Sequence, residues 1–275
     1  MLEQIHHSRV KLSQGQVFWR EIGQSSLNLV FLHGSWHDGR QWLPVFEHLC
    51  PEFRCFAPDL LGCGESDFPN IHYSIDLMVE SLAEYLNLLK LEDVCLVGHS
   101  LGGWIAASYA LKYPERVRRL ILISPEGLKA TSQQERWRRW RWLAHPPAPL
   151  YMILKLIHPF TQLVGQGKKI EKILKRREEI LSYVSASQLM FKRRWAEYRA
   201  ELLDERLSSL QAPVLILQGT HDHAIAQSIS EAYSVLAPMA DLQLVKPGGD
   251  NLPEELPDVI AQYIREFVAG YLKFL

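Results

Sequence analysis

The feature that most constrains the fold of this chain is a regular alternation of short β-rich runs with longer stretches whose apolar residues recur at helical spacing. Strands that alternate with helices form βαβ units, in which helices cover both faces of a mainly parallel sheet. The chain therefore predicts an α/β fold. The predicted strands cover residues 16–22, 28–32, 53–57, 94–97, 117–123, 213–217 and 241–245. The predicted helices cover residues 74–90, 101–111, 227–236 and 253–267.

The alternation stops for 88 residues between Ser124 and Pro213. This segment has no clear strand pattern and is rich in tryptophan, basic residues and helix formers, and it is too long for a loop. Its pattern predicts helices over residues 133–143, 150–164 and 168–191. Since no low-complexity linker marks a second domain, we interpret residues 125–212 as a helical cap inserted into a core formed by residues 1–124 and 213–275.

The chemical signal is the sequence Gly98-His99-Ser100-Leu101-Gly102, which lies between a predicted strand and a predicted helix. It matches the pattern G-x-S-x-G, in which a sharp turn presents the serine and small neighbours let strand and helix approach closely. The positive end of the helix then stabilises negative charge that develops near the serine. We predict that Ser100 is a nucleophile.

A second loop supports this prediction. His33-Gly34-Ser35-Trp36 follows the apolar strand 28–32, where a loop can direct a backbone N–H group toward the serine. The N–H groups of Ser35 and Leu101 are the predicted oxyanion donors, each typically contributing about 3 kcal/mol to lowering the barrier. The predicted substrate contacts are His33, Trp36 and His99.

These motifs resemble those of the α/β-hydrolase family, and the resemblance extends over essentially the whole chain. HGSW at 33–36 looks like that family's oxyanion loop, PDLLGCGESD at 58–67 like its P-D-x-x-G-x-G-x-S-D turn, and GHSLGG at 98–103 like its nucleophile turn. The resemblance implies an eight-stranded, mostly parallel sheet with helices on both faces and a helical cap after the sixth strand. Within the turn motif, Asp59 and Asp67 are interpreted as structural.

The family's catalytic acid and base follow the serine in the order Ser, Asp, His. Asp222, just after the strand 213–217, matches the acid, and Glu126, just after the strand 117–123, is an alternative. The base is where this chain departs from the family. The pattern P-G-x-H-x-x-x-x-E-x-P here has Asp250 at the histidine, while Glu255 and Pro257 keep their expected offsets.

The missing base leaves three interpretations. A serine without a general base is a poor nucleophile, and loss of one triad member typically lowers turnover by about 10⁴–10⁶-fold. In the first interpretation, the chain descends from a working hydrolase in which position 250 has changed, by engineering or by natural drift. Alternatively, a histidine from another position serves as the base; the candidates are His33, His37, His99, His221 and His223. In the third interpretation, the protein is a pseudo-hydrolase that binds a ligand as a receptor or scaffold.

The first interpretation predicts a serine hydrolase of the esterase type with low activity. Its reaction is cleavage of an ester, thioester, amide or activated C–C bond in a small or medium-sized, partly apolar substrate, through an acyl-enzyme on Ser100. The sequence contains no metal-binding, nucleotide or flavin motif, so no cofactor and no metal are expected. It does not identify the substrate.

The formal net charge of −1 conceals a strong separation of charge. Residues 129–200 carry a net charge of +11 and four of the eight tryptophans, and the rest of the chain carries −12. We favour an amphipathic cap whose charges are solvated. The alternatives are an anionic substrate, such as an acyl compound with a carboxylate or phosphate, and contact with an anionic membrane surface, for which the apolar stretch 150–164 is suitable. The acidic core and the lack of a known motif argue against nucleic acid.

Three further features bear on location and assembly. The N-terminal sequence MLEQIHHSRV lacks the apolar core of a signal peptide, and no apolar run reaches the ~20 residues of a spanning helix. The four cysteines show no C-x-x-C spacing, which predicts reduced thiols. We therefore expect a cytoplasmic protein with a small-molecule substrate. The oligomeric state stays open.

Overall fold

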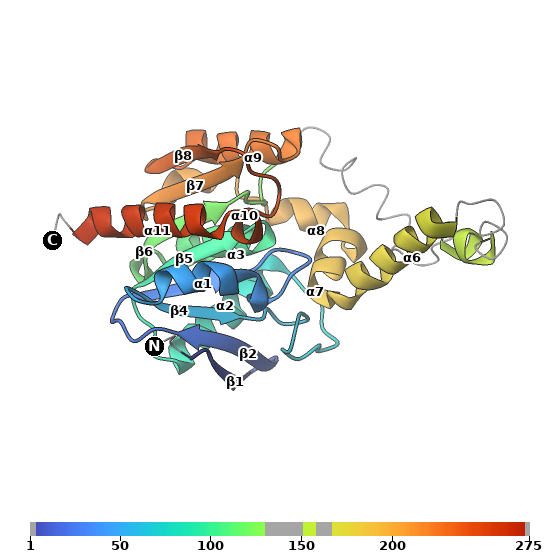
Figure 1. Cartoon of the computed structure of the whole chain (residues 1–275), viewed down its shortest axis with the longest axis horizontal. Coiled ribbons are helices and arrows are strands. Elements are labelled where there is room, and N and C mark those ends of the chain that lie inside the picture. The colour runs from blue at the N-terminus through green and yellow to red at the C-terminus, as the bar shows by residue number, and fades with distance from the viewer. Residues whose placement is uncertain (1–3, 130–150, 158–166, 273–275) are drawn as a thin grey trace.

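The computed structural model describes residues 4–129, 151–157 and 167–272, in which eight strands form one sheet (Figure 1). Their spatial order is β1-β2-β4-β3-β5-β6-β7-β8. The β1–β2 and β2–β4 pairs are antiparallel, and the pairs from β4 to β8 are parallel. This confirms the eight-stranded, mostly parallel sheet. The strands are β1 (His6–Leu12), β2 (Gly15–Ile22), β3 (Asn28–Leu32), β4 (Arg54–Pro58), β5 (Val94–His99), β6 (Val117–Ile123), β7 (Val214–Gly219) and β8 (Ala240–Val245).

Helices cover both faces of the sheet, because alternate residues of its central strands point to opposite sides. In β6, Leu120 and Leu122 join a buried cluster with α2, α3 and α9, whereas Ile121 and Ile123 join one with α1, α10 and α11. These strands therefore appear in the sequence as continuous apolar runs. The core helices are α1 (Leu43–Leu49), α2 (Ile75–Leu88), α3 (Leu101–Lys112), α9 (Ala224–Leu236), α10 (Leu252–Glu255) and α11 (Pro257–Leu272), with the short 3-10 turns η1 (Gly39–Trp42), η2 (Pro114–Arg116) and η4 (Leu207–Ser209).

The cap consists of helices that follow the sixth strand, as expected. The described part comprises a helix over residues 151–157, α6 (Gly167–Ser182), α7 (Val184–Ser187), the π-helical turn η3 (Gln188–Lys192) and α8 (Trp195–Ala200). Figure 1 shows α6 and the 151–157 helix extending away from the sheet. The predicted helix 133–143 and the second half of 150–164 lie outside the described residues. The boundaries 124/125 and 212/213 between core and cap stay a prediction.

Two contacts join the cap to the ends of core strands. The indole of Trp36, in the loop after β3, stacks on Phe191 of η3 with ring centroids 5.6 Å apart. The N–H of Val184 donates to the carbonyl oxygen of Gly62, in the turn after β4, at 2.9 Å. Since both loops follow the carboxyl ends of parallel strands, the cap covers the edge of the sheet where ligands bind in open α/β folds.

The structure differs from the sequence prediction in three places. The helix expected over 168–191 ends at Ser182 and is followed by α7 and η3. The helix expected over 253–267 is two helices, because Pro257 begins α11 without an N–H group and the chain turns at Leu256. The sequence pattern also did not predict β1 and α1. β1 pairs only with β2 among the described strands and exposes most of its residues, so it lacks the apolar run of a buried strand.

Candidate active site

Ser100 lies in the tight turn between β5 and α3, as the motif predicts. Its backbone has φ 51° and ψ −113°, a region in which residues other than glycine are strained. The neighbouring positions require glycine. A Cβ atom on Gly98 would lie 2.4 Å from the carbonyl oxygen of Gly102, and one on Gly102 would lie 2.2 Å from that of Leu32. The two glycines therefore let β3, β5 and α3 meet closely enough to hold Ser100 at the start of the helix.

A buried carboxylate lies beside this serine. The Ser100 hydroxyl donates to Oε1 of Glu126 at 3.4 Å, and Glu126 is only 3% exposed. The backbone N–H of Glu126 donates to the carbonyl oxygen of Ser100 at 3.1 Å. The hydroxyl of Tyr233 donates to the Glu126 carbonyl oxygen at 2.7 Å, and burial raises the pKa of this tyrosine well above 10, which keeps it a donor. The backbone thus fixes Glu126 next to Ser100.

The predicted oxyanion donors belong to adjacent segments. Leu101 is the first residue of α3, so its N–H has no acceptor within the helix. Ser35 is buried in the loop after β3. This loop packs against the residue before the nucleophile, because a Cβ on Gly34 would lie 2.6 Å from Nδ1 of His99. Their role as oxyanion donors is part of the proposal below.

His99 is held by a hydrogen-bond network that the sequence did not indicate. Gln41 accepts from the N–H of Gly34 through Oε1 at 3.0 Å, so its amide nitrogen is the end that faces His99 and Asn251. That nitrogen lies 2.9 Å from Nδ1 of His99, which must therefore accept. Nε2 of the ring then carries the proton and donates to the carbonyl oxygen of Asp250 at 2.9 Å.

The expected acid, Asp222, lies just after β7 in a polar cluster. Its Oδ1 accepts from the N–H of His223 at 2.6 Å and its Oδ2 from the side-chain amide of Gln218 at 3.0 Å. The hydroxyl of Ser230 donates to Oε1 of that glutamine at 2.6 Å and so orients it. A carboxylate has about four acceptor sites, so Asp222 retains capacity for a further donor.

Asp250 lies in the loop between β8 and α10, and its side chain is exposed. Its backbone is fixed beside the nucleophile turn through His99. The preceding residue, Gly249, donates its N–H to Oε2 of Glu255 at 2.7 Å, and the following residue, Asn251, accepts from Gln41. These contacts hold the backbone around position 250; its correspondence to the family's histidine stays a prediction from the offsets of Glu255 and Pro257.

His33 is held by contacts within the protein, and its predicted contact with substrate stays a prediction. It is fully buried, the N–H of Leu60 donates to its Nε2 at 3.0 Å, and its Nδ1 donates to the carbonyl oxygen of Gly34 at 2.9 Å. Burial lowers the pKa of His33, against the attraction of nearby Asp59. Both ring nitrogens of His99 also form hydrogen bonds within the protein, to Gln41 and to the backbone of Asp250. Of the three predicted substrate contacts, Trp36 lies where core and cap meet.

Three of the candidate replacement bases lie in the turn after β7 and in the loop after β3. His223 is exposed, and its Nδ1 accepts from the N–H of Ile225 at 3.3 Å, which caps α9. His221 is also exposed, on the same turn. The ring of His37 packs against that of His99 with centroids 6.1 Å apart and lies 3.7 Å from a carboxylate oxygen of Glu254.

Comparison with known proteins agrees with this geometry. The model of the alpha/beta hydrolase fold family matches residues 28–257, from β3 into α11. The chain belongs to this family. The matched residues include the loop after β3, the turn at Ser100 and the loop after β8.

Three relatives illustrate the range of this hydrolase family. The carboxylesterase YbfK of Bacillus subtilis is 26% identical over 263 residues, which are 90% of this chain and 81% of YbfK. The 1-acylglycerol-3-phosphate O-acyltransferase ABHD5 of Rattus norvegicus is 34% identical over 169 residues, 57% of this chain and 45% of that protein. A thermophilic esterase from Thermogutta terrifontis superposes with a TM-score of 0.72 at 26% identity, covering 96% of this chain and 98% of the esterase.

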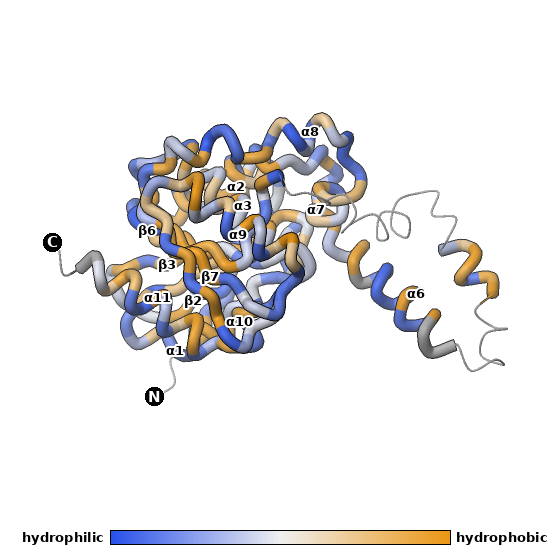
Figure 2. The backbone as a smooth tube through the Cα atoms, turned by 90° about the horizontal axis from the view of Figure 1, so that it is seen from above, coloured by the Kyte–Doolittle hydropathy of each residue, from blue (hydrophilic) through white to orange (hydrophobic). Residues whose placement is uncertain are grey.

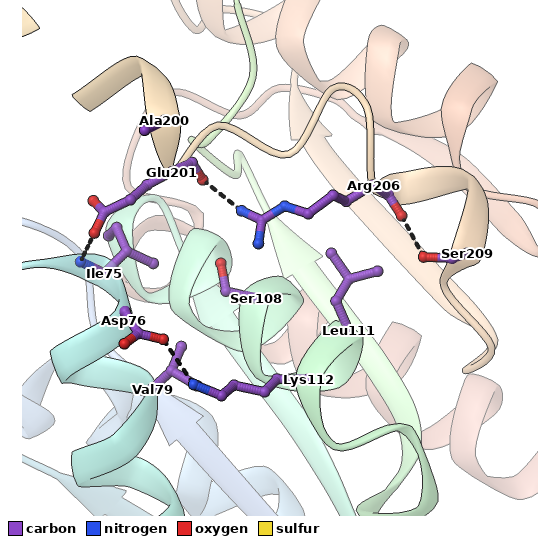
Figure 3. A pocket seen from close by; sticks show the side chains of 10 residues that line it. All are labelled: Ile75, Asp76, Val79, Ser108, Leu111, Lys112, Ala200, Glu201, Arg206 and Ser209. Carbon is purple, nitrogen blue, oxygen red and sulfur yellow. Dashed lines mark hydrogen bonds and ion pairs between the residues drawn. The ribbon is translucent and has the colours of Figure 1, made fainter. Parts of the chain in front are cut away.

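A separate cavity of this hydrolase, of about 440 Å³, lies between α2, the end of α3 and the chain that follows α8 (Figure 3). Ser108 on its wall is about 12 Å along α3 from the nucleophile turn. Its charged groups have partners in the wall: Lys112 pairs with Asp76 at 2.8 Å, and Arg206 donates to the backbone carbonyl of Glu201 at 3.1 Å. Because these charges are satisfied within the wall, we assign this cavity to the joint between core and cap.

Glu201 is the centre of that joint. Its Oε1 accepts from the N–H of Ile75 at the start of α2 at 3.1 Å, and its carboxylate pairs with Arg193 of the cap. Its carbonyl oxygen also accepts from the indole N–H of Trp104 in α3 at 3.3 Å.

None of the helices in the described ranges has both the length and the apolar character needed to cross a bilayer.

Proposed function

We propose that this alpha/beta hydrolase cleaves an ester, thioester, amide or activated C–C bond in a small or medium-sized, partly apolar substrate through an acyl-enzyme on Ser100. The observation that carries the proposal is the strained Ser100 turn with a buried carboxylate, Glu126, 3.4 Å from its hydroxyl. This distance is long for an O–H···O bond. Catalytic hydrogen bonds are commonly long without substrate and shorten in the reacting complex.

Glu126 is the proposed proton acceptor in a chain that has aspartate at position 250. As Oγ of Ser100 attacks the carbonyl carbon, its proton passes to the carboxylate of Glu126. The bond to the leaving group then breaks, and Glu126 returns the proton to that group. In the second half, water attacks the acyl-enzyme, gives its proton to Glu126, and Ser100 leaves as the hydroxyl on receiving that proton.

The backbone N–H groups of Ser35 and Leu101 hold the oxyanion in both halves of the reaction. Asp222 and Asp250 occupy the places of the family's acid and base. A carboxylate is a weaker base than imidazole toward a serine hydroxyl, since its ordinary pKa is about two units lower. The proposal therefore expects low turnover from this chain, and an increase when residue 250 becomes histidine, which would connect Ser100 to Asp222.

Three observations favour particular substrates. Esterases occur among the relatives of this chain. The cap segment from 129 to 200 carries a net charge of +11, which attracts an acyl compound that also bears a carboxylate or a phosphate. The relative ABHD5 is named for an acyl acceptor with a phosphate group. We therefore propose an anionic acyl compound as the preferred substrate.

The alternative function is that of a pseudo-hydrolase, which retains the pocket as a ligand receptor or scaffold. It is favoured by Asp250 at the position of the base and by the commitment of His99 to Gln41 and to the loop after β8. The two functions differ in one property, the reactivity of the Ser100 hydroxyl.

Labelling with a fluorophosphonate probe, read by mass spectrometry, tests the function. The natural chain is expected to label slowly on Ser100, Ser100→Ala not at all, and Asp250→His at least 100-fold faster. Glu126→Gln should slow labelling of the natural chain at least 10-fold but leave Asp250→His nearly unchanged. p-Nitrophenyl acetate and butyrate should show the same ranking in burst release.

Each contrary result has a defined meaning. If neither the natural chain nor Asp250→His labels, the hydrolase proposal is wrong and the pseudo-hydrolase is supported. If the natural chain labels quickly, and His223→Ala abolishes labelling while Asp250→Ala does not, His223 is the base. Equal rates for the natural chain and Glu126→Gln exclude Glu126 as the proton acceptor.

A further inference from the structure

The cap presents an apolar surface that the reaction does not use. In the helix 151–157, Met152 is 65% exposed, Ile153 55%, Leu156 75% and Ile157 37%. At 100° per residue these four positions fall on one side of the helix. We call them the apolar tip. Large apolar side chains gathered on one exposed face are uncommon in proteins unless the face binds something.

The opposite side of this helix faces the cap. The guanidinium of Arg177 in α6 lies 3.8 Å from the ring centroid of Tyr151, and both Tyr151 and Leu154 are partly buried. This contact orients the helix, because it directs residues 151 and 154 toward α6 and the apolar tip away from it. Figure 2 shows the apolar segment beside α6, apart from the body of the molecule.

Basic residues lie on the helix of the apolar tip and on α6, which contacts that helix through Arg177. The α6 helix carries six basic residues and three acidic ones. Among them Lys172 and Lys175 are exposed, and Lys155 lies on the helix of the tip itself. An apolar face flanked by lysine and arginine is the combination that binds at the interface of an anionic bilayer, where the apolar groups enter the acyl boundary and the cations contact lipid phosphates.

We propose that the apolar tip and the exposed lysines of α6 form a docking surface for a membrane that contains anionic phospholipid. The described residues of this helix span about 10 Å, and no helix of the described ranges is long and apolar enough to cross a bilayer, so we place the tip in the interface. From its contact with this helix at Arg177, α6 leads to α7 and η3, which contact the loops after β4 and β3. Docking therefore brings the core to the membrane by its cap, with the site-bearing edge of the sheet facing the lipid side of the molecule.

Vesicle flotation of the full chain tests this surface, with phosphatidylcholine alone and with 30% phosphatidylglycerol. The chain is expected to float with the anionic vesicles at low salt, several-fold less at 0.5 M salt, and little with phosphatidylcholine alone, because cations and apolar groups act together. The double variant Met152→Ser/Leu156→Ser should lower binding at least 10-fold. Lys172→Gln/Lys175→Gln should lower it several-fold.

Matched controls remove the same chemistry from the core. Val235→Ser/Leu244→Ser deletes two apolar side chains that are 83% and 53% exposed, and Lys11→Gln/Lys90→Gln deletes two exposed lysines. Both should float like the natural chain. Ser100→Ala should also float normally, so that this result is independent of catalysis.

Three results would overturn the proposal. The first is equal flotation with both kinds of vesicle, or none with either. The second is normal flotation of Met152→Ser/Leu156→Ser. The third is a chain that does not float but elutes as a dimer and becomes monomeric on that substitution, which would show that the tip binds a second copy.

Discussion

Nε2 of His99 donates a hydrogen bond to the backbone carbonyl oxygen of Asp250, at 2.9 Å. The residue before Ser100 is thereby tied to the loop between β8 and α10. Gln41 donates to the other ring nitrogen and also contacts Gly34 and Asn251. The network thus holds the loop after β3, the turn at Ser100 and the loop after β8 in one arrangement.

The first prediction concerns Gln41. Gln41→Leu leaves the N–H of Gly34, Nδ1 of His99 and Oδ1 of Asn251 without their partner, and buried polar groups without partners are costly. We expect the free energy of unfolding in urea to fall by about 3 kcal/mol. Gln262→Leu is the control, since its bond to Glu266 lies on the exposed surface of α11. A loss as small as that of the control would contradict the role of Gln41.

The second prediction concerns pH. Burial lowers the pKa of His33, and of His37, below the ordinary value of 6.5. Below pH 6.5 the unfolded chain therefore binds protons that the folded chain does not. Stability is fully present above that pH and falls as the pH decreases, by at most about 1.4 kcal/mol per pH unit for each histidine.

Urea unfolding between pH 8 and pH 5 measures this slope. His33→Gln should be less stable at pH 8 but show a shallower decline, because one of the two histidines no longer contributes. The range stops above the ordinary pKa of carboxylates such as Asp38, whose ordinary value is 3.8. An unchanged slope in His33→Gln would show that this histidine does not couple stability to pH.

Cysteine reactivity provides the third prediction. All four cysteines are free, and burial raises the pKa of Cys63 and of Cys95 to about 12. Cys55 is buried as well, and Cys50 is partly exposed. Iodoacetamide at pH 7.5 should modify Cys50 alone in the native protein and all four after unfolding, because the thiolate is the reactive form. Rapid modification of a second native cysteine would contradict the buried placement.

Two adjacent glycines provide the fourth prediction. In Gly102→Ala the new Cβ would meet the carbonyl oxygen of Leu32 at 2.2 Å, a backbone atom that cannot move alone. We expect a loss of about 3 kcal/mol or more, or failure to fold. In Gly103→Ala the nearest atom is Cβ of Pro125 at 3.1 Å, so stability should change by at most about 1 kcal/mol. Equal effects of the two substitutions would show that the turn is not tightly packed.

The sequence predicted those parts of the fold in which burial dominates. The continuous apolar runs of β3, β5, β6 and β7 are buried on both faces, so pattern and structure coincide. β1 was missed because its residues are mostly polar and exposed, and it is a strand only because it pairs with β2. Orientation of the cap was beyond the sequence, since α6 has few contacts with the core.

For the site, the motif gave Ser100 and its turn, but not the partners of its side chain. Glu126 was an alternative to Asp222 in the sequence, and only the fold shows that its carboxylate lies beside the Ser100 hydroxyl. His33 and His99 were predicted to contact substrate because they belong to the motifs around Ser35 and Ser100. Their roles depend on Leu60 and Asp250, which approach from distant parts of the chain.

The backbone of Ser100 has a consequence for the choice between enzyme and binding protein. A residue other than glycine at φ 51° and ψ −113° destabilises the folded chain by about 1–3 kcal/mol. Glycine would relieve that strain and would still form the turn. Ser100→Gly is therefore a substitution from which a protein that only holds a ligand gains stability, and one that a protein using the hydroxyl cannot accept.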